Sequence, residues 1–182
     1  KRWPVAAAVV LALVAGSLVT AWARRPAPRV ITSEGYLTYS GTDYSPAVSP
    51  DGKLIAFSSA RDGVQRIWLK QVAGGGEVAL TTGADDFPRF TPDGASILYI
   101  HADPNQRLNG SLWRVAVVGG EPRRLLDEVT NADLSPDGSQ LAFIRPVQEN
   151  GVARGALFVS DANGAGARQL ARSHHGPSDP PW

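Results

Sequence analysis

The stretch that decides the fold is Ser49-Pro50-Asp51-Gly52, which recurs as Thr91-Pro92-Asp93-Gly94 and Ser135-Pro136-Asp137-Gly138. The three copies are spaced by 42 and 44 residues. Each copy has the composition of a tight turn: proline presets φ, aspartate bonds the backbone of its own turn, and glycine accepts the positive φ that closes it. A turn requirement therefore explains the three aspartates without a catalytic role.

Each copy is followed by the same series of short apolar segments. The first segments are Leu54–Phe57, Ile97–Ile100 and Leu141–Ile144, and the second are Ile67–Leu69, Leu112–Val115 and Leu157–Val159. Short apolar runs bounded by turn residues predict strands, and a repeat of about 40–50 residues is the period of β-propeller blades. The sequence predicts an all-β chain, an incomplete β-propeller of about three four-stranded antiparallel blades.

The expected strands of the first blade are Pro46–Ser49, Lys53–Ser59, Arg66–Val72 and Glu77–Thr81. Each Pro-Asp-Gly is expected in the turn between the first and second strands, as in a hairpin built on a type I turn. In the third blade a longer loop is expected from Pro146 to Gly155.

The segment from Ser45 to Ser59, SPAVSPDGKLIAFSS, with Ala60-Arg61-Asp62-Gly63 after it, resembles the WD-repeat-like repeats of the TolB family. The resemblance covers about Tyr44 to Arg172, with degraded later copies. It implies a propeller fold, but it implies no single function, because such propellers serve as scaffolds in unrelated proteins.

The N-terminal region carries 18 uncharged, mostly apolar residues from Val5 to Trp22. This length just meets the requirement for crossing a bilayer, and Trp3 and Trp22 stand where interfacial tryptophans belong. We expect a transmembrane helix or uncleaved signal anchor in residues 1–23, contacting the membrane through residues 4–23. The alternative is a secretory signal peptide, with Lys1-Arg2 as its basic region and cleavage at Ala23.

Residues 24–43 are interpreted as a linker, because Arg25-Pro26-Ala27-Pro28 favours a stiff, extended chain. Residues 44–182 are then the TolB-like blades. The last residues, Gly176 to Trp182, match the entry to a blade, so we expect the blades to be truncated at the start of a fourth. The chain is therefore interpreted as a fragment of a larger protein.

Charge and composition exclude several classes of function. Residues 30–182 hold 13 basic and 17 acidic residues, a net charge of −4, so the blades lack the basic surface that nucleic-acid binding requires. The chain has no cysteine and hence no thiol site for zinc or redox chemistry. It contains no Gly-x-Ser-x-Gly elbow, P-loop or His-Glu-x-x-His sequence. No catalytic, cofactor-binding or metal-binding residue is predicted.

Four aspartates are candidates for a binding rim. Asp43, Asp85-Asp86 and Asp133 (with Asn131) are expected at equivalent places before the first strand of each blade. Such connections cluster at the mouth of a propeller channel, so the rim would be acidic and could hold a cation or a basic peptide; solvated loops are the alternative. A protein, a peptide or a small ligand at the mouth is the expected partner. The recurring aromatic residues are interpreted as packing.

Three functions remain open at this stage. A single anchor followed by TolB-like blades looks like the extracytoplasmic part of bacterial receptor-type serine/threonine kinases, and of some winged-helix regulators, which would make the chain a binding or sensing module outside the cytoplasm. Prolyl-oligopeptidase-type serine peptidases also carry a propeller, next to a hydrolase domain. A periplasmic TolB-like envelope protein, released by cleavage at Ala23, is the third. The parent reading frame distinguishes the three.

Overall fold

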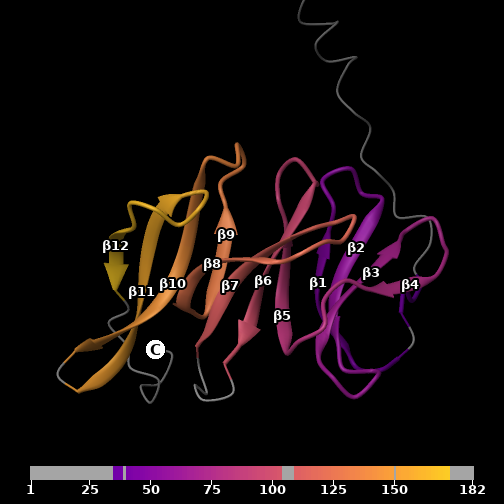
Figure 1. Cartoon of the computed structure of the whole chain (residues 1–182), viewed down its shortest axis with the longest axis horizontal. Helices are drawn as coiled ribbons and strands as arrows, with labels where there is room; N and C mark the ends of the chain where they lie inside the picture. The colour runs from indigo at the N-terminus through magenta and orange to yellow at the C-terminus, as the bar shows by residue number, and fades with distance from the viewer. Residues whose placement is uncertain (1–34, 39, 104–108, 150, 173–182) are drawn as a thin grey trace, which may run out of the picture. The chain divides into compact units, whose positions relative to one another are not determined.

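The computed structural model describes residues 35–38, 40–103, 109–149 and 151–172 (Figure 1). Twelve β-strands and no helix occur within these ranges. None of the described residues belongs to a helix long and apolar enough to cross a membrane. The expected transmembrane helix, its signal-peptide alternative and the start of a fourth blade lie outside the described residues. The strands belong to a compact unit that begins at Leu37.

The strands form three separate four-stranded sheets, which we call blades 1, 2 and 3. Blade 1 consists of β1 (Asp43–Val48), β2 (Leu54–Ser59), β3 (Arg66–Gln71) and β4 (Glu77–Ala79). Blade 2 consists of β5 (Asp85–Phe90), β6 (Ser96–Ala102), β7 (Gly110–Ala116) and β8 (Arg123–Val129). Blade 3 consists of β9 (Asn131–Leu134), β10 (Gln140–Glu149), β11 (Val152–Asp161) and β12 (Arg168–Arg172).

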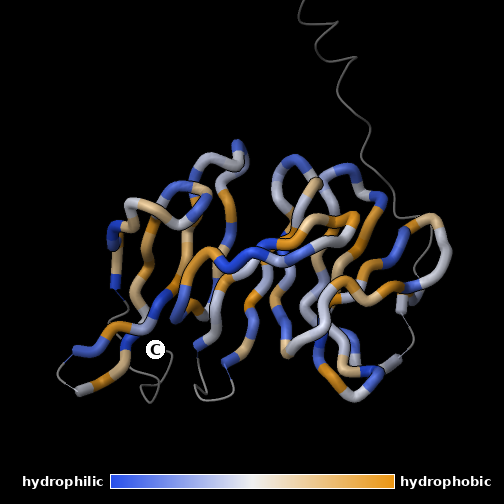
Figure 2. The backbone as a smooth tube through the Cα atoms, in the orientation of Figure 1, coloured by the Kyte–Doolittle hydropathy of each residue, from blue (hydrophilic) through white to orange (hydrophobic). Residues whose placement is uncertain are grey.

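Within each blade the spatial order of the strands follows the chain, and every neighbouring pair is antiparallel. The prediction of three four-stranded antiparallel blades is confirmed. In Figure 2 much of the inner strands is coloured as apolar, and hydrophilic stretches lie in turns and along outer strands such as β8 and β12.

The Pro-Asp-Gly turns lie between the first and second strands of each blade, as predicted. In blade 1 the Gly52 N–H donates to the carbonyl of Ser49 at 2.8 Å, and Gly52 has φ +73°. The Ser49 hydroxyl donates to the Asp51 carboxylate at 2.7 Å, which in turn accepts the Lys53 N–H at 3.1 Å. Blades 2 and 3 repeat this geometry around Asp93 and Asp137. The three aspartates therefore stabilise turns.

These turns make the stability of the blades sensitive to acid. The Ser135 hydroxyl, together with the backbone and side chain of Ser139, lowers the pKa of Asp137 to about 2. Hydrogen bonds from Ser49 and Thr91 likewise lower the pKa of Asp51 and Asp93. The pKa of an aspartate in the unfolded chain is about 4. These carboxylates therefore contribute stability above about pH 4, and that contribution is lost as the pH falls toward about 2.

We expect the variant carrying D51N, D93N and D137N to lose less stability on acidification than the wild type. The measurement is the urea midpoint of the full chain at pH 7, 4 and 2.5. An equal drop in midpoint for the two proteins between pH 4 and 2.5 would contradict the assignment. The triple variant should still lose some stability on acidification, because the pKa of Asp43 is also lowered.

Two apolar clusters join the blades. The face between blades 1 and 2, which we call the first seam, is built on Ala56, Ile67 and Leu69 packed against Ile97 and Tyr99. The second seam, between blades 2 and 3, joins residues of β6 and β7 to Ala132, Leu141 and Phe143. Odd-numbered residues of β6 thus face blade 1 while even-numbered ones face blade 3, as expected for a strand buried on both sides.

The prediction of a long loop from Pro146 to Gly155 is wrong. Pro146 pairs with Gly155 inside a longer hairpin, and the β10–β11 ladder continues to the pair Glu149 and Val152. The physical reason is in the sequence: Asn150-Gly151 is the residue pair that favours a two-residue hairpin turn, and Gly151 has φ +79°.

Candidate functional site

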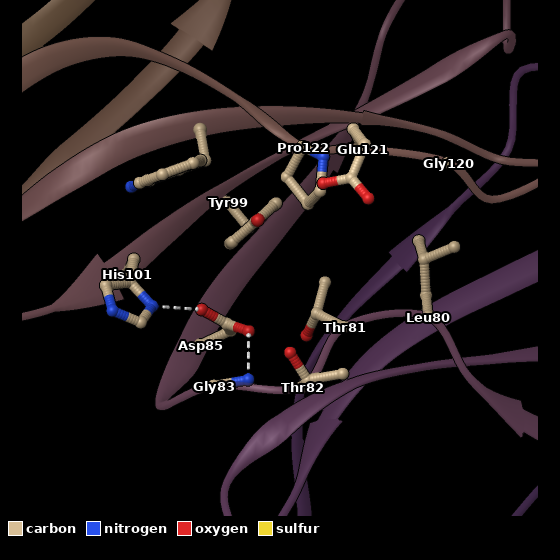
Figure 3. A pocket seen from close by; sticks show the side chains of 11 residues that line it. Leu80, Thr81, Thr82, Gly83, Asp85, Tyr99, His101, Gly120, Glu121 and Pro122 are labelled. Atoms are coloured by element: carbon tan, nitrogen blue, oxygen red, sulfur yellow. Dashed lines mark hydrogen bonds and ion pairs between the residues drawn. The ribbon is translucent and has the colours of Figure 1, made fainter.

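The described part of the chain contains a pocket of about 350 Å³ at the first seam (Figure 3). One wall is the segment that leaves β4 and leads into β5, and the other is formed by β6, β7 and the turn before β8. The described residues that line it are Leu80, Thr81, Thr82, Gly83, Asp85, Tyr99, His101, Trp113, Gly120, Glu121 and Pro122.

A carboxylate–imidazole pair closes one end of the pocket. Asp85 opens β5 and stands opposite His101 on β6, and its Oδ1 lies 2.7 Å from His101 Nδ1. Its Oδ2 accepts the Gly83 N–H at 3.2 Å. Both oxygens of this carboxylate therefore have a hydrogen-bond partner, as a side chain that is only 2% exposed requires. A Cβ on Gly83 would lie 2.7 Å from His101 Cε1, so a larger residue at this position would displace the imidazole.

Two aromatic rings form the floor. Tyr99 and Trp113 stand directly opposite each other on β6 and β7, and the His101 ring meets Trp113 edge-on at 5.9 Å. Burial, and then the negative charge of Asp85, raise the pKa of Tyr99. Both effects disfavour the phenolate, and the second one reflects the negative charge of Asp85 near the ring.

The charged side chains among the described lining residues favour a cation. Glu121 brings a second carboxylate from the turn before β8, and none of the described lining residues is lysine or arginine. No hydroxyl among the described residues is hydrogen-bonded to His101, so the contact between nucleophile and base that covalent catalysis uses is missing from this part of the chain. Nor do the described ranges contain a group of three histidine or carboxylate side chains placed to hold a metal ion.

The four candidate rim aspartates are not alike. Asp43 opens β1 as Asp85 opens β5, and its side chain is 8% exposed and bonded to Arg61 at 2.7 Å. Burial raises the pKa of Asp43, but hydrogen bonds from Ser40, Ser59 and Arg61 outweigh it and hold the pKa far below its ordinary value. Asp86 accepts the hydroxyl of Ser58 at 2.7 Å across the first seam.

Asp133 is not equivalent to the other candidates. It pairs with Ala142 on β10, the register position that Ala47 and Arg89 occupy in blades 1 and 2. The expected equivalence is therefore wrong for this residue, and Asp133 is instead 67% exposed with Arg89 at 4.0 Å. Asp85 is thus the single rim candidate that lines the pocket. Binding of a cation or basic peptide by the rim stays a prediction.

The sequence analysis singled out Asp85 as a rim candidate but did not pair it with His101. A usable signal existed: the aspartate lies six residues before the start of its turn phrase and the histidine ten residues after it. The antiparallel register brings those two positions opposite each other.

Comparisons with known proteins agree with the blades. No family model matches the chain. An uncharacterized protein of Agrobacterium fabrum, Atu1656, is 29% identical over 118 residues, which cover 58% of this chain and 40% of that protein. A structure described as TolB from Agrobacterium tumefaciens superposes with a TM-score of 0.61 at 25% identity, covering 71% of this chain and 49% of that one. The blades are TolB-like.

Two further solved structures share the fold alone. TolB from Acinetobacter baumannii has a TM-score of 0.59 at 22% identity over 72% of this chain and 32% of its own. The acylaminoacyl peptidase of Pyrococcus horikoshii has a TM-score of 0.55 at 12% identity over 71% of this chain and 25% of its own. This chain spans less than half the length of each of these relatives.

Proposed function

We propose that the chain is the blade region of a membrane-anchored binding or sensing module that works outside the cytoplasm, with no catalytic activity of its own. The observation that carries the proposal is the pocket at the first seam: it gathers carboxylates, an imidazole and aromatic rings, yet no nucleophile is bonded to the imidazole among the described residues. The ligand is then a protein, a peptide or a small molecule rather than nucleic acid.

The anchor and the location rest on the sequence. The apolar run from Val5 to Trp22 supports a single-pass anchor in a bacterial inner membrane, with the blades on the periplasmic side. A receptor-type serine/threonine kinase or a winged-helix regulator is the parent that this architecture favours. Its kinase or DNA-binding domain would be encoded upstream of Lys1.

The anchor is tested by expressing the full 182-residue chain, preceded by a start codon, in a bacterium. We expect the chain in the membrane fraction, resistant to alkaline carbonate, because an uncharged run of this length partitions into the bilayer. Protease added to spheroplasts should digest the blades. Mass spectrometry of the product provides the control: a new N-terminus at Arg24 indicates a signal peptide, and digestion only after lysis refutes the extracytoplasmic location.

The propeller of a serine peptidase is the runner-up. The likeness to acylaminoacyl peptidase structures favours it, although the fold alone is shared at that identity. A Gly-x-Ser-x-Gly elbow encoded downstream of Trp182 would establish this reading, and a kinase or winged-helix domain upstream would exclude it. A free periplasmic TolB-like protein is the third reading, and it requires cleavage at Ala23.

A further inference from the structure

The three blades repeat one aromatic pair. Strand register places Phe57 opposite Trp68 in blade 1, Tyr99 opposite Trp113 in blade 2, and Phe143 opposite Phe158 in blade 3. The first member always lies eight residues after the start of the turn phrase. The blades can therefore be compared position by position, each serving as a reference for the other two.

In blade 1 the aromatic pair holds an arginine of the same blade. The Arg61 guanidinium carbon lies 5.1 Å from the centre of the Phe57 ring and 4.8 Å from that of Trp68. The guanidinium donates to Asp43 at 2.7 Å and also to Glu77. Two rings and two carboxylates thus form a cage around one cation, the arrangement in which cation–π and charge-assisted hydrogen bonds act together.

Blade 3 also covers its rings with its own arginine. The Arg145 guanidinium carbon lies 5.3 Å from the centre of the Phe143 ring and 5.7 Å from that of Phe158. It donates to the carbonyl oxygen of Asp127, at the end of blade 2, at 3.0 Å. The arginine comes from a different position than Arg61, so the two blades reach the same contact by different routes.

Among the described residues, which leave out 104–108 and with them Arg107, blade 2 has the aromatic pair and an aspartate of the cage but no arginine over the rings. Asp85 matches Asp43 in register. Glu121 follows a glycine pair as Glu77 does and lines the same pocket as the two rings, but it lies one residue before the register match of Glu77. His101 holds the position of Arg145, ten residues after the start of the turn phrase. Its shorter side chain is bonded to Asp85, and its ring lies at 65° to that of Trp113. Within the described residues, the space beside Tyr99 and Trp113 is the pocket of about 350 Å³.

We infer that this pocket binds a guanidinium group from outside the chain, either free arginine or an arginine side chain of a peptide. The inference rests on the proposed binding role and names the ligand class of the same site. Tyr99 and Trp113 supply the faces for the planar cation, and Glu121 supplies a carboxylate to pair with it. The neutral isostere citrulline fits the same space but gains neither the ring–cation attraction nor the ion pair.

The test is isothermal titration of the full 182-residue chain, held in a mild non-ionic detergent, with four probes. L-Arginine and a short peptide with one central arginine are the ligands, and L-citrulline and the same peptide with citrulline are their neutral controls. We expect at least one arginine probe to bind saturably and about tenfold or more tightly than its citrulline partner. Tighter binding of the peptide identifies a protein partner, and tighter binding of L-arginine identifies the free amino acid.

Three variants locate the binding. Glu121 is exposed, so E121Q should leave folding unchanged and weaken arginine binding about tenfold, while E128Q, which removes an exposed charge away from the pocket, should not change it. H101R should abolish binding, because an arginine at that position can lie over the rings as Arg145 does in blade 3. Its melting temperature, measured alongside, should equal or exceed that of the wild type.

Several results would overturn the inference. Equal affinity for arginine and citrulline would do so, as would wild-type affinity in a folded H101R variant. So would binding that appears only after Arg107→Gln, since the cation would then belong to the chain itself; Arg107 lies outside the described residues. None of these results bears on the membrane location, which the fractionation and protease experiment measures independently.

Discussion

Replacing Phe143 with alanine is expected to lower the free energy of unfolding by about 3–5 kcal/mol, the usual cost of deleting a buried phenylalanine ring. Phe143 is 1% exposed and belongs to the cluster of the second seam. Its ring stacks on that of Phe158, with centroids 5.5 Å apart, and it also faces the Arg145 guanidinium. The substitution removes all three contacts and leaves a cavity between two blades.

The measurement is urea unfolding of the full chain followed by circular dichroism. V152A is the matched control, because Val152 also lies in blade 3 but is 43% exposed, and it should shift the free energy of unfolding by less than about 0.5 kcal/mol. Similar losses for the two variants would show that the second seam does not hold the blades together.

Replacing Arg61 with leucine is expected to cost about 2–4 kcal/mol, somewhat less than for a fully buried ion pair. The arginine side chain is 20% exposed, and its removal takes the shared cation from the carboxylates of Asp43 and Glu77, which are 8% and 18% exposed. Lys70, which also pairs with Glu77 at 2.8 Å, remains and limits the loss. The leucine retains part of the contact with the two rings.

A triple variant separates the charge effect from the loss of packing. R61L combined with D43N and E77Q should regain part of the lost stability, because no uncompensated carboxylate then remains, although Lys70 loses its partner Glu77. The R61L single variant should also lose less stability between pH 5 and pH 2 than the wild type does. Removing one of the donors that hold the pKa of Asp43 low reduces its acid-linked contribution. A triple variant as unstable as R61L would contradict the electrostatic account.

Local features of the fold were readable from the sequence. The turn phrases, the strands that follow them and the blade period are all set within about 45 residues of chain, and the structure places them as predicted. The β10–β11 hairpin was missed although its Asn150-Gly151 pair was visible, because a stretch without strong apolar alternation was interpreted as a loop. The membrane segment was predicted from length and composition and stays a prediction.

The misplacement of Asp133 could have been avoided from the sequence. Asp43 and Asp85 each lie six residues before the start of their turn phrase, whereas Asp133 lies two residues before its own. Ala47 and Arg89 also lie two residues before their phrases, and the three residues share one register position. The bulges of β1 and β5 fall farther from the phrase, between Tyr44 and Ala47 and between Asp86 and Arg89, so they do not affect this match.

The cage was harder to predict than the fold. The sequence offered Arg61 only as part of the TolB-like segment Ala60-Arg61-Asp62-Gly63, and the aromatic residues were interpreted as packing. In the structure the Gly63 N–H closes a turn on the carbonyl of Ala60. That the arginine reaches back over two rings depends on the direction of its side chain. The difference between blades 1 and 2 becomes visible only when their described residues are compared through the strand register.

The order of strands within the blades has a consequence for how the chain acquires its structure. Every strand is paired with the strand just before or after it in the sequence, so the loops that must close are short and their entropic cost is small. We expect blade 1 to assemble while later blades are still being synthesised, and each new blade to dock on the apolar face that the previous one presents. Folding would then advance along the chain in one direction, as a growing stack rather than a single collapse.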